Sequence, residues 1–279
     1  MKPIIHASHL SMFQKCGESY RRRYAEGQII PPGIAMVVGS GTHKGAETDM
    51  LRKIETGTVA DLEEVKAAAR DYITGSFTVG DISLTQDEKR AGKKVVAGAC
   101  VDQALGLLDI YHRGLAPMIE PVTVERPWRV EVPGYPFDLG GRYDVEEVGG
   151  IRDLKTKGGR PAKGLEDRMQ QLTLYGIAKG IEDDKPIEDV RLTVDWLVKN
   201  KTPIGVTRST RRTEEDANRL LRIVMAFWGA VEKGVFMPCA PDSLDSWKCN
   251  PKWCGYYDTC PYARGHHAVS VPNTERVFK

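Results

Sequence analysis

The sequence of 279 residues contains no long apolar run and no strong excess of either charge. No stretch approaches the roughly 20 consecutive apolar residues that a membrane-spanning helix needs. The apolar run near the N-terminus is too short for a secretory signal, so we expect a cytoplasmic protein without membrane contact. Because 40 basic residues against 38 acidic ones give a net charge of only +2, any polyanionic partner must be held by local basic patches.

Cysteine is also scarce, since six residues are too few for a disulfide scaffold in a chain of this length. Cys16 and Cys100 stand alone, and the other four fall in one C-terminal stretch. Thiolates so close together are typical of metal ligands rather than of inert buried side chains. An iron–sulfur cluster usually takes four cysteines, whereas zinc accepts mixtures of cysteine and histidine. The C-terminal cysteines are Cys239, Cys249, Cys254 and Cys260, and the further candidate zinc ligands are His266 and His267.

The order of predicted elements favours a single α/β domain with an added N-terminal helical part. Hydrophobic residues make up 41% of the chain and charged residues 28%, as in folded globular proteins. Apolar periodicity predicts helices first, then a three-strand meander, a helix, a hairpin and a last helix. The helices are predicted at 8–24, 36–53, 61–75, 84–112, 165–179 and 213–234, and the strands at 121–132, 136–148, 151–157, 189–199 and 204–209.

The most informative segment holds two carboxylates and a lysine on neighbouring predicted strands. Gly141-Arg-Tyr-Asp144 lies on the first strand and Asp153-Leu-Lys155 on the second, with a Gly-Gly turn between them. The hairpin should bring Asp144 beside Asp153, and residues two apart on a strand share a face. Carboxylate oxygens are the ligands that Mg²⁺ or Mn²⁺ prefers, and a lysine can orient an attacking water. This set is what metal-assisted phosphodiester hydrolysis requires.

Four motifs in order resemble the PD-(D/E)XK nuclease superfamily, specifically its RecB-like branch. That branch is marked by a histidine on an upstream helix, a G-x-x-D strand end, a D/E-x-K strand and a Q-x-x-x-Y helix. The resemblance covers residues 8–262 and implies a restriction-endonuclease-like α/β core, a central mixed sheet flanked by helices. Asp153 fills a position where many relatives have glutamate. The matching positions here are His43, Gly141–Asp144, Asp153–Lys155 and Gln171–Tyr175.

The resemblance also implies roles for these residues. His43, Asp144, Asp153 and the carbonyl of Leu154 would hold Mg²⁺ or Mn²⁺, and Lys155 would serve the attacking water. Glu47 lies four residues after His43 on the same helix face and is a further upstream ligand candidate. On the later helix, Gln171 and Tyr175 would position DNA or the catalytic lysine.

For the cysteines, the resemblance implies a [4Fe–4S] cluster bound by one early and three late residues. Zinc remains the alternative, and Cys100 is predicted to be an ordinary core residue. The cluster would clasp both ends of a single nuclease domain at 1–265, leaving a C-terminal tail at 266–279. The implied cluster ligands are Cys16, Cys249, Cys254 and Cys260.

The resulting hypothesis is a metal-dependent DNA exonuclease of phage or prokaryotic recombination, repair or CRISPR adaptation. The alternatives are a structure-specific endonuclease and a non-catalytic DNA-binding module of a larger complex. The expected substrate is DNA with a free end or a single-stranded part, and a recombination or CRISPR adaptation protein is an expected partner. The basic run at 199–212 is a candidate contact for the DNA backbone, and Tyr143 and Trp196 are candidates for stacking on bases.

Overall fold

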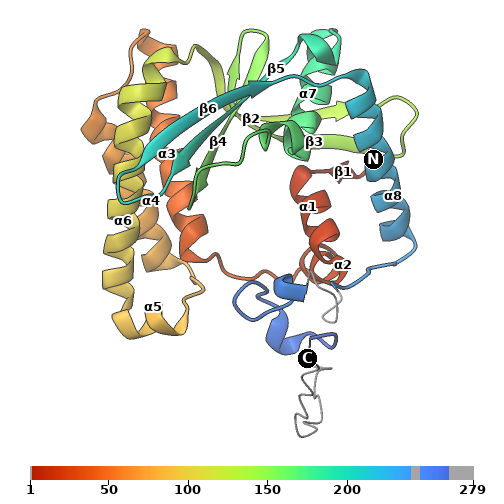
Figure 1. Ribbon diagram of the computed structural model, residues 1–279, viewed down its shortest axis with the longest axis horizontal. Helices are drawn as coiled ribbons and strands as arrows, with labels where there is room; N and C mark the ends of the chain where they lie inside the picture. Colours follow the sequence, from red (N-terminus) through yellow and green to blue (C-terminus); the bar gives the residue numbers. More distant parts are fainter. Residues whose placement is uncertain (1, 240–245, 264–279) are drawn as a thin grey trace, which may run out of the picture. The chain divides into compact units, whose positions relative to one another are not determined.

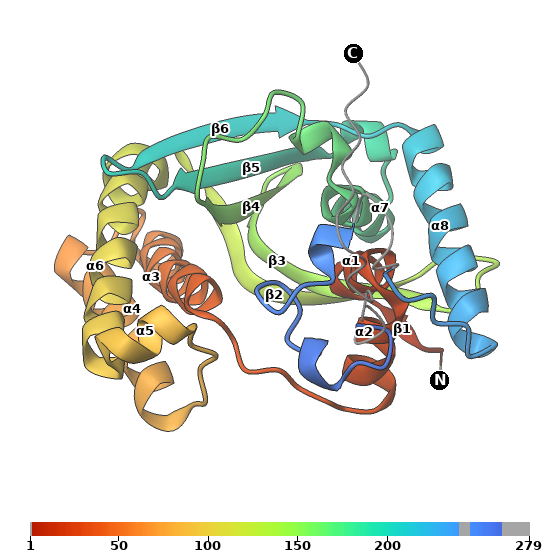
Figure 2. The same cartoon turned by 60° about the horizontal axis from the view of Figure 1, so that its bottom comes forward.

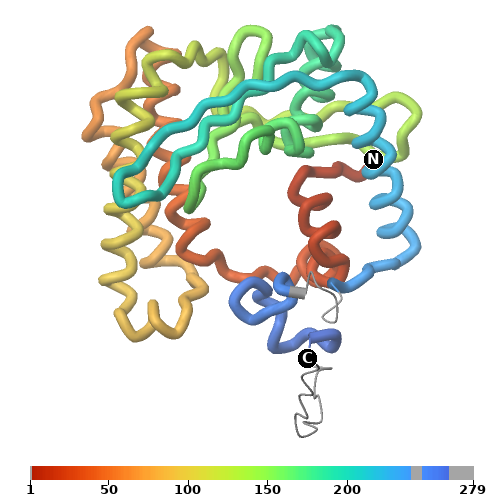
Figure 3. The backbone as a smooth tube through the Cα atoms, viewed as in Figure 1, coloured from red at the N-terminus to blue at the C-terminus, as the bar shows by residue number. Residues whose placement is uncertain are grey.

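A computed structural model describes residues 2–239 and 246–263 of the chain. The chain divides into two compact units. The larger unit comprises Met1–Leu10 and Pro31–Glu232, and the cysteine-rich unit comprises Ser11–Ile30 and Lys233–Lys279. Figure 3 traces the red N-terminal and blue C-terminal segments that contribute to the cysteine-rich unit. The predicted tail at 266–279 lies outside the described residues, and no described helix is long and apolar enough to cross a membrane.

The larger unit is built on one mixed sheet, as the sequence predicts. Its described strands are β1 (Ile4–Ile5), β2 (Pro121–Glu131), β3 (Asp138–Glu147), β4 (Gly150–Lys157), β5 (Arg191–Val198) and β6 (Ile204–Thr210). Strands β2, β3 and β4 form an antiparallel meander, β5 runs parallel to β4, and β6 returns antiparallel to β5. The two-residue β1 lies parallel to β3. The sequence did not predict β1, because two residues are too few to show any periodicity.

Three long helices cover one face of this sheet: α3 (Ile34–Thr56), α4 (Leu62–Val79) and α6 (Lys93–Ile110). They share a hydrophobic core with Val145, Leu154 and Leu197 of the strands, and Figures 1 and 2 show them gathered together. The glycines of α3 permit close helix packing. A Cβ at Gly45 would lie 2.5 Å from the side chain of Leu108, and one at Gly41 would lie 2.6 Å from Ile73.

The helix α7 (Gln170–Asp183) packs on the other face of the sheet. Its Gly176 approaches the side chain of Leu192, whereas Leu197 of the same strand joins the core under α3. Because side chains alternate along a strand, these two contacts lie on opposite faces. The last long helix is α8 (Glu214–Glu232), and the short α5 (Gln86–Ala91) begins at a capping box made by Thr85 and Glu88.

The cysteine-rich unit contains short helical turns. The helix predicted at 8–24 is interrupted, because Cys16 adopts an extended backbone between α1 (Ala7–Lys15) and α2 (Gly17–Tyr20). A π-helical turn, Arg21–Ala25, follows. The buried guanidinium of Arg22 joins the early and late segments, since it donates to the hydroxyl of Thr259 at 2.9 Å and to the carbonyl of Thr259 at 3.1 Å.

Candidate active site

The candidate site lies where β3 and β4 separate. The two strands pair only from Val145–Arg152 to Glu147–Gly150. At its other end, β3 pairs with β1 through Asp138 and Leu139, while β2 follows its opposite edge along almost the whole length. Strands β1 and β4 therefore share one edge of β3. Between them, that edge has no strand partner among the described residues.

Side chains take the place of the missing strand along this edge. The Nδ1 atom of His6 lies 2.8 Å from the carbonyl oxygen of Gly140, and the hydroxyl of Tyr175 donates to the carbonyl of Arg142 at 2.8 Å. The carboxylate of Asp144 accepts a hydrogen bond from the backbone N–H of Leu154 at 2.8 Å. The opening is therefore held by hydrogen bonds, as the buried backbone groups of a strand require.

The strand β4 presents Asp153 and Lys155 at this opening. Since Leu154 packs into the core under α3, its two neighbours project from the opposite face of the strand. Asp153 is fully buried, and its Oδ1 accepts from the Lys155 ammonium at 2.8 Å. Its Oδ2 is also buried and has no hydrogen-bond partner among the described residues. A buried carboxylate oxygen without a partner is costly, and a bound cation would satisfy it.

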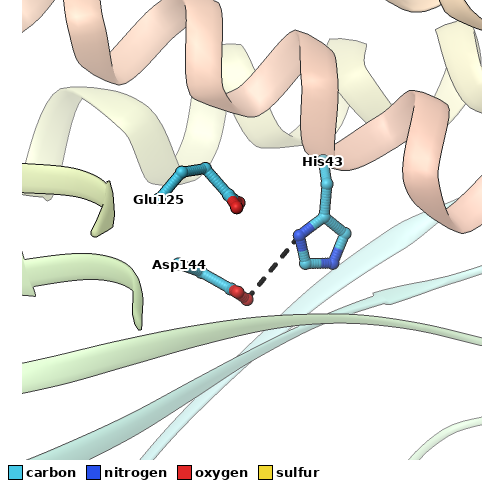
Figure 4. Close-up of side chains that lie close together, drawn as sticks. All are labelled: His43, Glu125 and Asp144. Carbon is cyan, nitrogen blue, oxygen red and sulfur yellow. Dashed lines mark ion pairs between the residues drawn. The ribbon is translucent and has the colours of Figure 1, made fainter. Parts of the chain in front are cut away.

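Three further ligand atoms converge beside it. One oxygen or nitrogen each from His43, Glu125 and Asp144 all lie within 4.8 Å of one another, the one such group in the described part of the chain. Figure 4 shows His43 on α3 pointing toward Asp144, with Nδ1 3.6 Å from Oδ2. The other upstream ligand candidate, Glu47, does not belong to this group and pairs with Lys44 at 2.8 Å.

Glu125 is the site residue that the sequence did not reveal. It belongs to β2 between Val124 and Arg126, which pair with Val145 and Tyr143, so it lies opposite Asp144. Its φ of 49° is unusual for a residue other than glycine. In the sequence it is one acidic residue in an ordinary strand pattern. Only the pairing with β3 identifies it as part of the site.

The charges at the site are strongly coupled. Burial and the nearby carboxylate of Asp153 raise the pKa of Asp144 to about 7, against the opposing effect of Lys155. Burial lowers the pKa of Lys155, but the two carboxylates outweigh it and keep this pKa above its ordinary value. Burial and the Lys155 ammonium lower the pKa of His43, which leaves a neutral imidazole with a lone pair for a metal. Excess negative charge and a neutral imidazole together suit a divalent cation.

Comparison with known proteins identifies the family. The model of the PD-(D/E)XK nuclease superfamily matches residues 5–261. The chain belongs to this superfamily. A crystal structure from Eubacterium rectale, provisionally named an exonuclease, matches with a TM-score of 0.56 and 15% identity, covering 88% of this chain and 87% of that chain. The structure of SSO0001 matches with a TM-score of 0.36 and 14% identity over 63% and 78% of the two chains, and no curated protein matches.

Membership of the nuclease superfamily implies hydrolysis of nucleic acid and the use of a divalent metal, and the neighbour of known structure shares the fold. The mixed α/β fold predicted from the motifs is confirmed. In this structure, hydrogen bonds connect the Q-x-x-x-Y motif of the nuclease to the strand β3. Gln171 donates to the hydroxyl of Tyr175 at 2.6 Å, and that hydroxyl holds Arg142, two residues before Asp144. The two residues thus contact β3, and their predicted role in positioning DNA or the catalytic lysine stays a prediction.

Two predicted nucleic-acid contacts are not available on this nuclease fold. Tyr143 and Trp196 are buried, so the prediction that they stack on bases is wrong. Tyr143 instead stacks on Trp128 with ring centroids 5.4 Å apart. The basic run at 199–212 is partly internal as well, because Arg212 is buried and Arg208 binds Glu166 at 3.1 Å.

The cysteines fall into two groups in the structure. Cys100 is a buried residue of α6 in the core of the larger unit, whereas Cys16 and the four late cysteines belong to the cysteine-rich unit. The Sγ of Cys16 accepts from the backbone N–H of Cys239 at 3.2 Å. Burial raises the pKa of the Cys249 thiol, and so do the neighbouring thiols of Cys239, Cys254, Cys260 and Cys16. Cys16 and Cys239 are therefore in contact, and the other late cysteines lie within electrostatic range of Cys249, but among the described residues no three cysteines converge as closely as His43, Glu125 and Asp144 do. His266 and His267 lie outside the described residues.

Gly17 is what lets the early and late segments of this unit meet. Its N–H donates to the carbonyl of Met237 at 2.7 Å, and a Cβ at this position would lie 2.7 Å from the backbone of Met237. We expect Gly17→Ala to destabilise the cysteine-rich unit by about 1–3 kcal/mol, because backbone cannot yield as a side chain can. Limited proteolysis across a urea series measures this loss. Gly75→Ala is the matched control, since its Cβ meets nothing within 4 Å, and an equal effect of both variants would contradict the packing argument.

Proposed function

We propose that the chain is a metal-dependent DNA exonuclease of the RecB-like type. The observation that carries this proposal is the opening between β3 and β4, where Asp144, Asp153 and Lys155 meet. A structural salt bridge alone does not account for this arrangement. It leaves a carboxylate oxygen of Asp153 buried without a partner and raises the pKa of Asp144. Buried ionisable groups with strongly shifted pKa values are characteristic of catalytic sites.

Asp144, Asp153, His43 and the carbonyl of Leu154 would hold the Mg²⁺ or Mn²⁺ ion, and Glu125 would add a further oxygen. The ion would supply Lewis-acid chemistry, which would polarise the scissile phosphate and make the attacking water more acidic. The ammonium of Lys155 is held by Asp153 on the open side of the strand, where it can orient the attacking water and stabilise charge on the phosphate. Tyr175 and Gln171 keep β3 in register for this step.

Glu125 gives a specific test of the metal set. We expect Glu125→Gln to raise the Mn²⁺ concentration needed for half-maximal cleavage by about tenfold, because the amide offers a weaker ligand in nearly the same shape. Isothermal titration with Mn²⁺ measures the same loss without turnover. Glu131→Gln is the matched control, since this carboxylate lies at the end of the same strand and pairs with Lys2. Equal metal affinity in wild type and Glu125→Gln would remove Glu125 from the site.

We also propose that Cys16, Cys249, Cys254 and Cys260 bind a [4Fe–4S] cluster. The donor set fits, because the cysteine-rich unit offers sulfur ligands from both ends of the chain. Iron–sulfur clusters are held by cysteine thiolates. Burial and the neighbouring cysteines raise the pKa of Cys249, and a cationic centre would oppose both effects by stabilising the thiolate. Zinc is the competing metal. Cys239 is then a candidate for one of the four ligands of the zinc ion.

Cleavage of DNA ends is the proposed specificity, and endonuclease action is the alternative. The decisive experiment compares end-labelled linear DNA with closed circular DNA, in Mg²⁺, Mn²⁺ and EDTA, using anaerobically purified protein. Degradation of linear DNA alone supports an exonuclease. Cutting of the circle supports the endonuclease, and binding without cleavage in any metal supports the non-catalytic module. A role in recombination, repair or CRISPR adaptation, and a partner from those systems, stay predictions from the resemblance.

A further inference from the structure

The cysteine-rich unit displays aromatic side chains in an unusual way. Residues 246–263 hold five of the 21 aromatic residues of the chain. Among its five tryptophans, Trp128 and Trp196 are buried, whereas Trp247 and Trp253 are 57% and 55% exposed. Large aromatic side chains normally contribute their area to a core, so two exposed tryptophans in one short segment indicate a contact surface.

These two tryptophans form one ordered surface. Their ring centroids are 6.1 Å apart, and the rings are nearly perpendicular, at 89°. The turn between them is fixed by Asn250. Its carbonyl accepts from the backbone N–H groups of Trp253 and Cys254, and its side-chain oxygen accepts from the backbone N–H of Lys252. The tryptophans are therefore held in place before a ligand arrives, which lowers the entropy cost of binding.

Positive charge accompanies the rings. The ammonium of Lys248 lies 5.7 Å from the ring centroid of Trp247, and that of Lys252 lies 5.3 Å from the ring centroid of Trp253. The described part of the cysteine-rich unit has seven basic residues and three acidic ones, a net charge of +4, whereas the whole chain carries only +2. An apolar protein partner or a neutral ligand would not account for the lysines beside both rings.

We propose that Trp247, Lys248, Lys252 and Trp253 form a binding surface for single-stranded DNA. Unpaired bases would stack on the two indole rings, and the adjoining phosphates would bind the two ammonium groups, a combination typical of proteins that bind single strands without sequence preference. In duplex DNA the base faces are stacked on neighbouring base pairs, so they are not free to stack on the indole rings. The proposal rests on the proposed nuclease function for its choice of DNA and adds a binding surface made by residues of the cysteine-rich unit.

The test measures binding of a fluorescein-labelled oligodeoxythymidylate by anisotropy in EDTA, with the full chain carrying Lys155→Ala. Stacking on a single base is worth about 1–3 kcal/mol, or roughly 5- to 150-fold in Kd. The pair Trp247→Leu and Trp253→Leu should therefore weaken binding at least about tenfold. The pair Trp247→Phe and Trp253→Phe keeps aromatic faces and should stay within about threefold of wild type. Tyr72→Leu, an exposed aromatic residue of α4, is the control and should have no effect.

The lysines make an independent prediction. Lys248→Gln with Lys252→Gln should reduce the slope of log K against log salt by about 1.4, since each phosphate contact on a single strand contributes roughly 0.7. The tryptophan variants should leave this slope unchanged. If the leucine pair does not fold, the test is the quenching of tryptophan fluorescence by the oligonucleotide, compared between the wild-type protein and the phenylalanine pair. A quench that persists in the phenylalanine pair overturns the proposal, and its loss supports it.

The two proposals fail separately. Wild-type affinity in the folded leucine pair, together with cleavage by the wild-type protein, overturns the binding surface and leaves the nuclease intact. Tryptophan-dependent binding by a protein that cleaves no DNA supports the surface and overturns the proposed activity.

Discussion

Asp153→Asn should remove at least about 99.9% of DNA cleavage while the melting temperature stays the same or rises. The activity falls because Asp153 is the buried carboxylate that both faces the proposed metal position and holds the Lys155 ammonium. The melting temperature does not fall because this buried carboxylate destabilises the metal-free fold. Its charge raises the pKa of Asp144, and its Oδ2 has no partner among the described residues. An isosteric amide relieves that repulsion.

Cleavage of end-labelled DNA and thermal unfolding in EDTA measure the two effects. Lys155→Ala should lose as much activity, and combining it with Asp153→Asn should cost little more, because the two residues act on one water. Lys157→Ala is the matched control, an exposed lysine two residues further along the same strand. A fully active Asp153→Asn protein would refute the assignment of the site, and so would a Lys157→Ala protein as inactive as Lys155→Ala.

Cys16→Ala should yield colourless protein with little iron or sulfide and with a protease-sensitive cysteine-rich unit. The cluster would join residues near the two ends of the chain, so its loss frees a loop that contains most of the protein. By analogy with long covalent cross-links, such a closure is worth on the order of 4–5 kcal/mol. Formation of a metal site is also coupled to folding, and we expect the loss of activity to follow from the loss of structure.

Cys100→Ala is the matched control for this variant. Cys100 is buried in the core of the larger unit and is not one of the cysteines of the cysteine-rich unit, so its replacement should leave the brown colour and the iron content intact. Iron, sulfide and zinc are measured after anaerobic purification. Zinc without iron or sulfide would replace the cluster by a zinc site and leave the nuclease assignment standing.

The order of elements could be predicted because its signals are local. The meander β2–β3–β4 turns at Gly149, whose φ of 69° suits glycine, and the sequence places a Gly-Gly pair there. Asp61 caps α4 by accepting from the N–H of Glu63, as its position before an apolar periodic run predicts. Gln171 and Tyr175, four apart on α7, meet on one face and form a hydrogen bond.

The site could be predicted only in part. The motif spacing located Asp144, Asp153, Lys155 and His43, but gave no sign of Glu125, which enters through its position opposite Asp144 on a neighbouring strand. The prediction that Tyr143 and Trp196 stack on bases failed because a residue type does not fix its burial. The Tyr143 ring packs against Tyr175 of α7 and the Trp196 ring is buried as well, whereas Trp247 and Trp253 are exposed.

The sequence by itself determined the class of fold, the strand that carries the D-x-K motif and the grouping of cysteines, because each depends on residues within one or two elements. The tertiary structure decided where β3 and β4 separate, that β1 occupies the far end of the same edge, and that Cys16 interrupts a predicted helix to meet Cys239. The last two features depend on contacts between residues more than 100 positions apart. Periodicity and capping act over a few residues and cannot specify which distant strand, helix or thiol completes a buried edge.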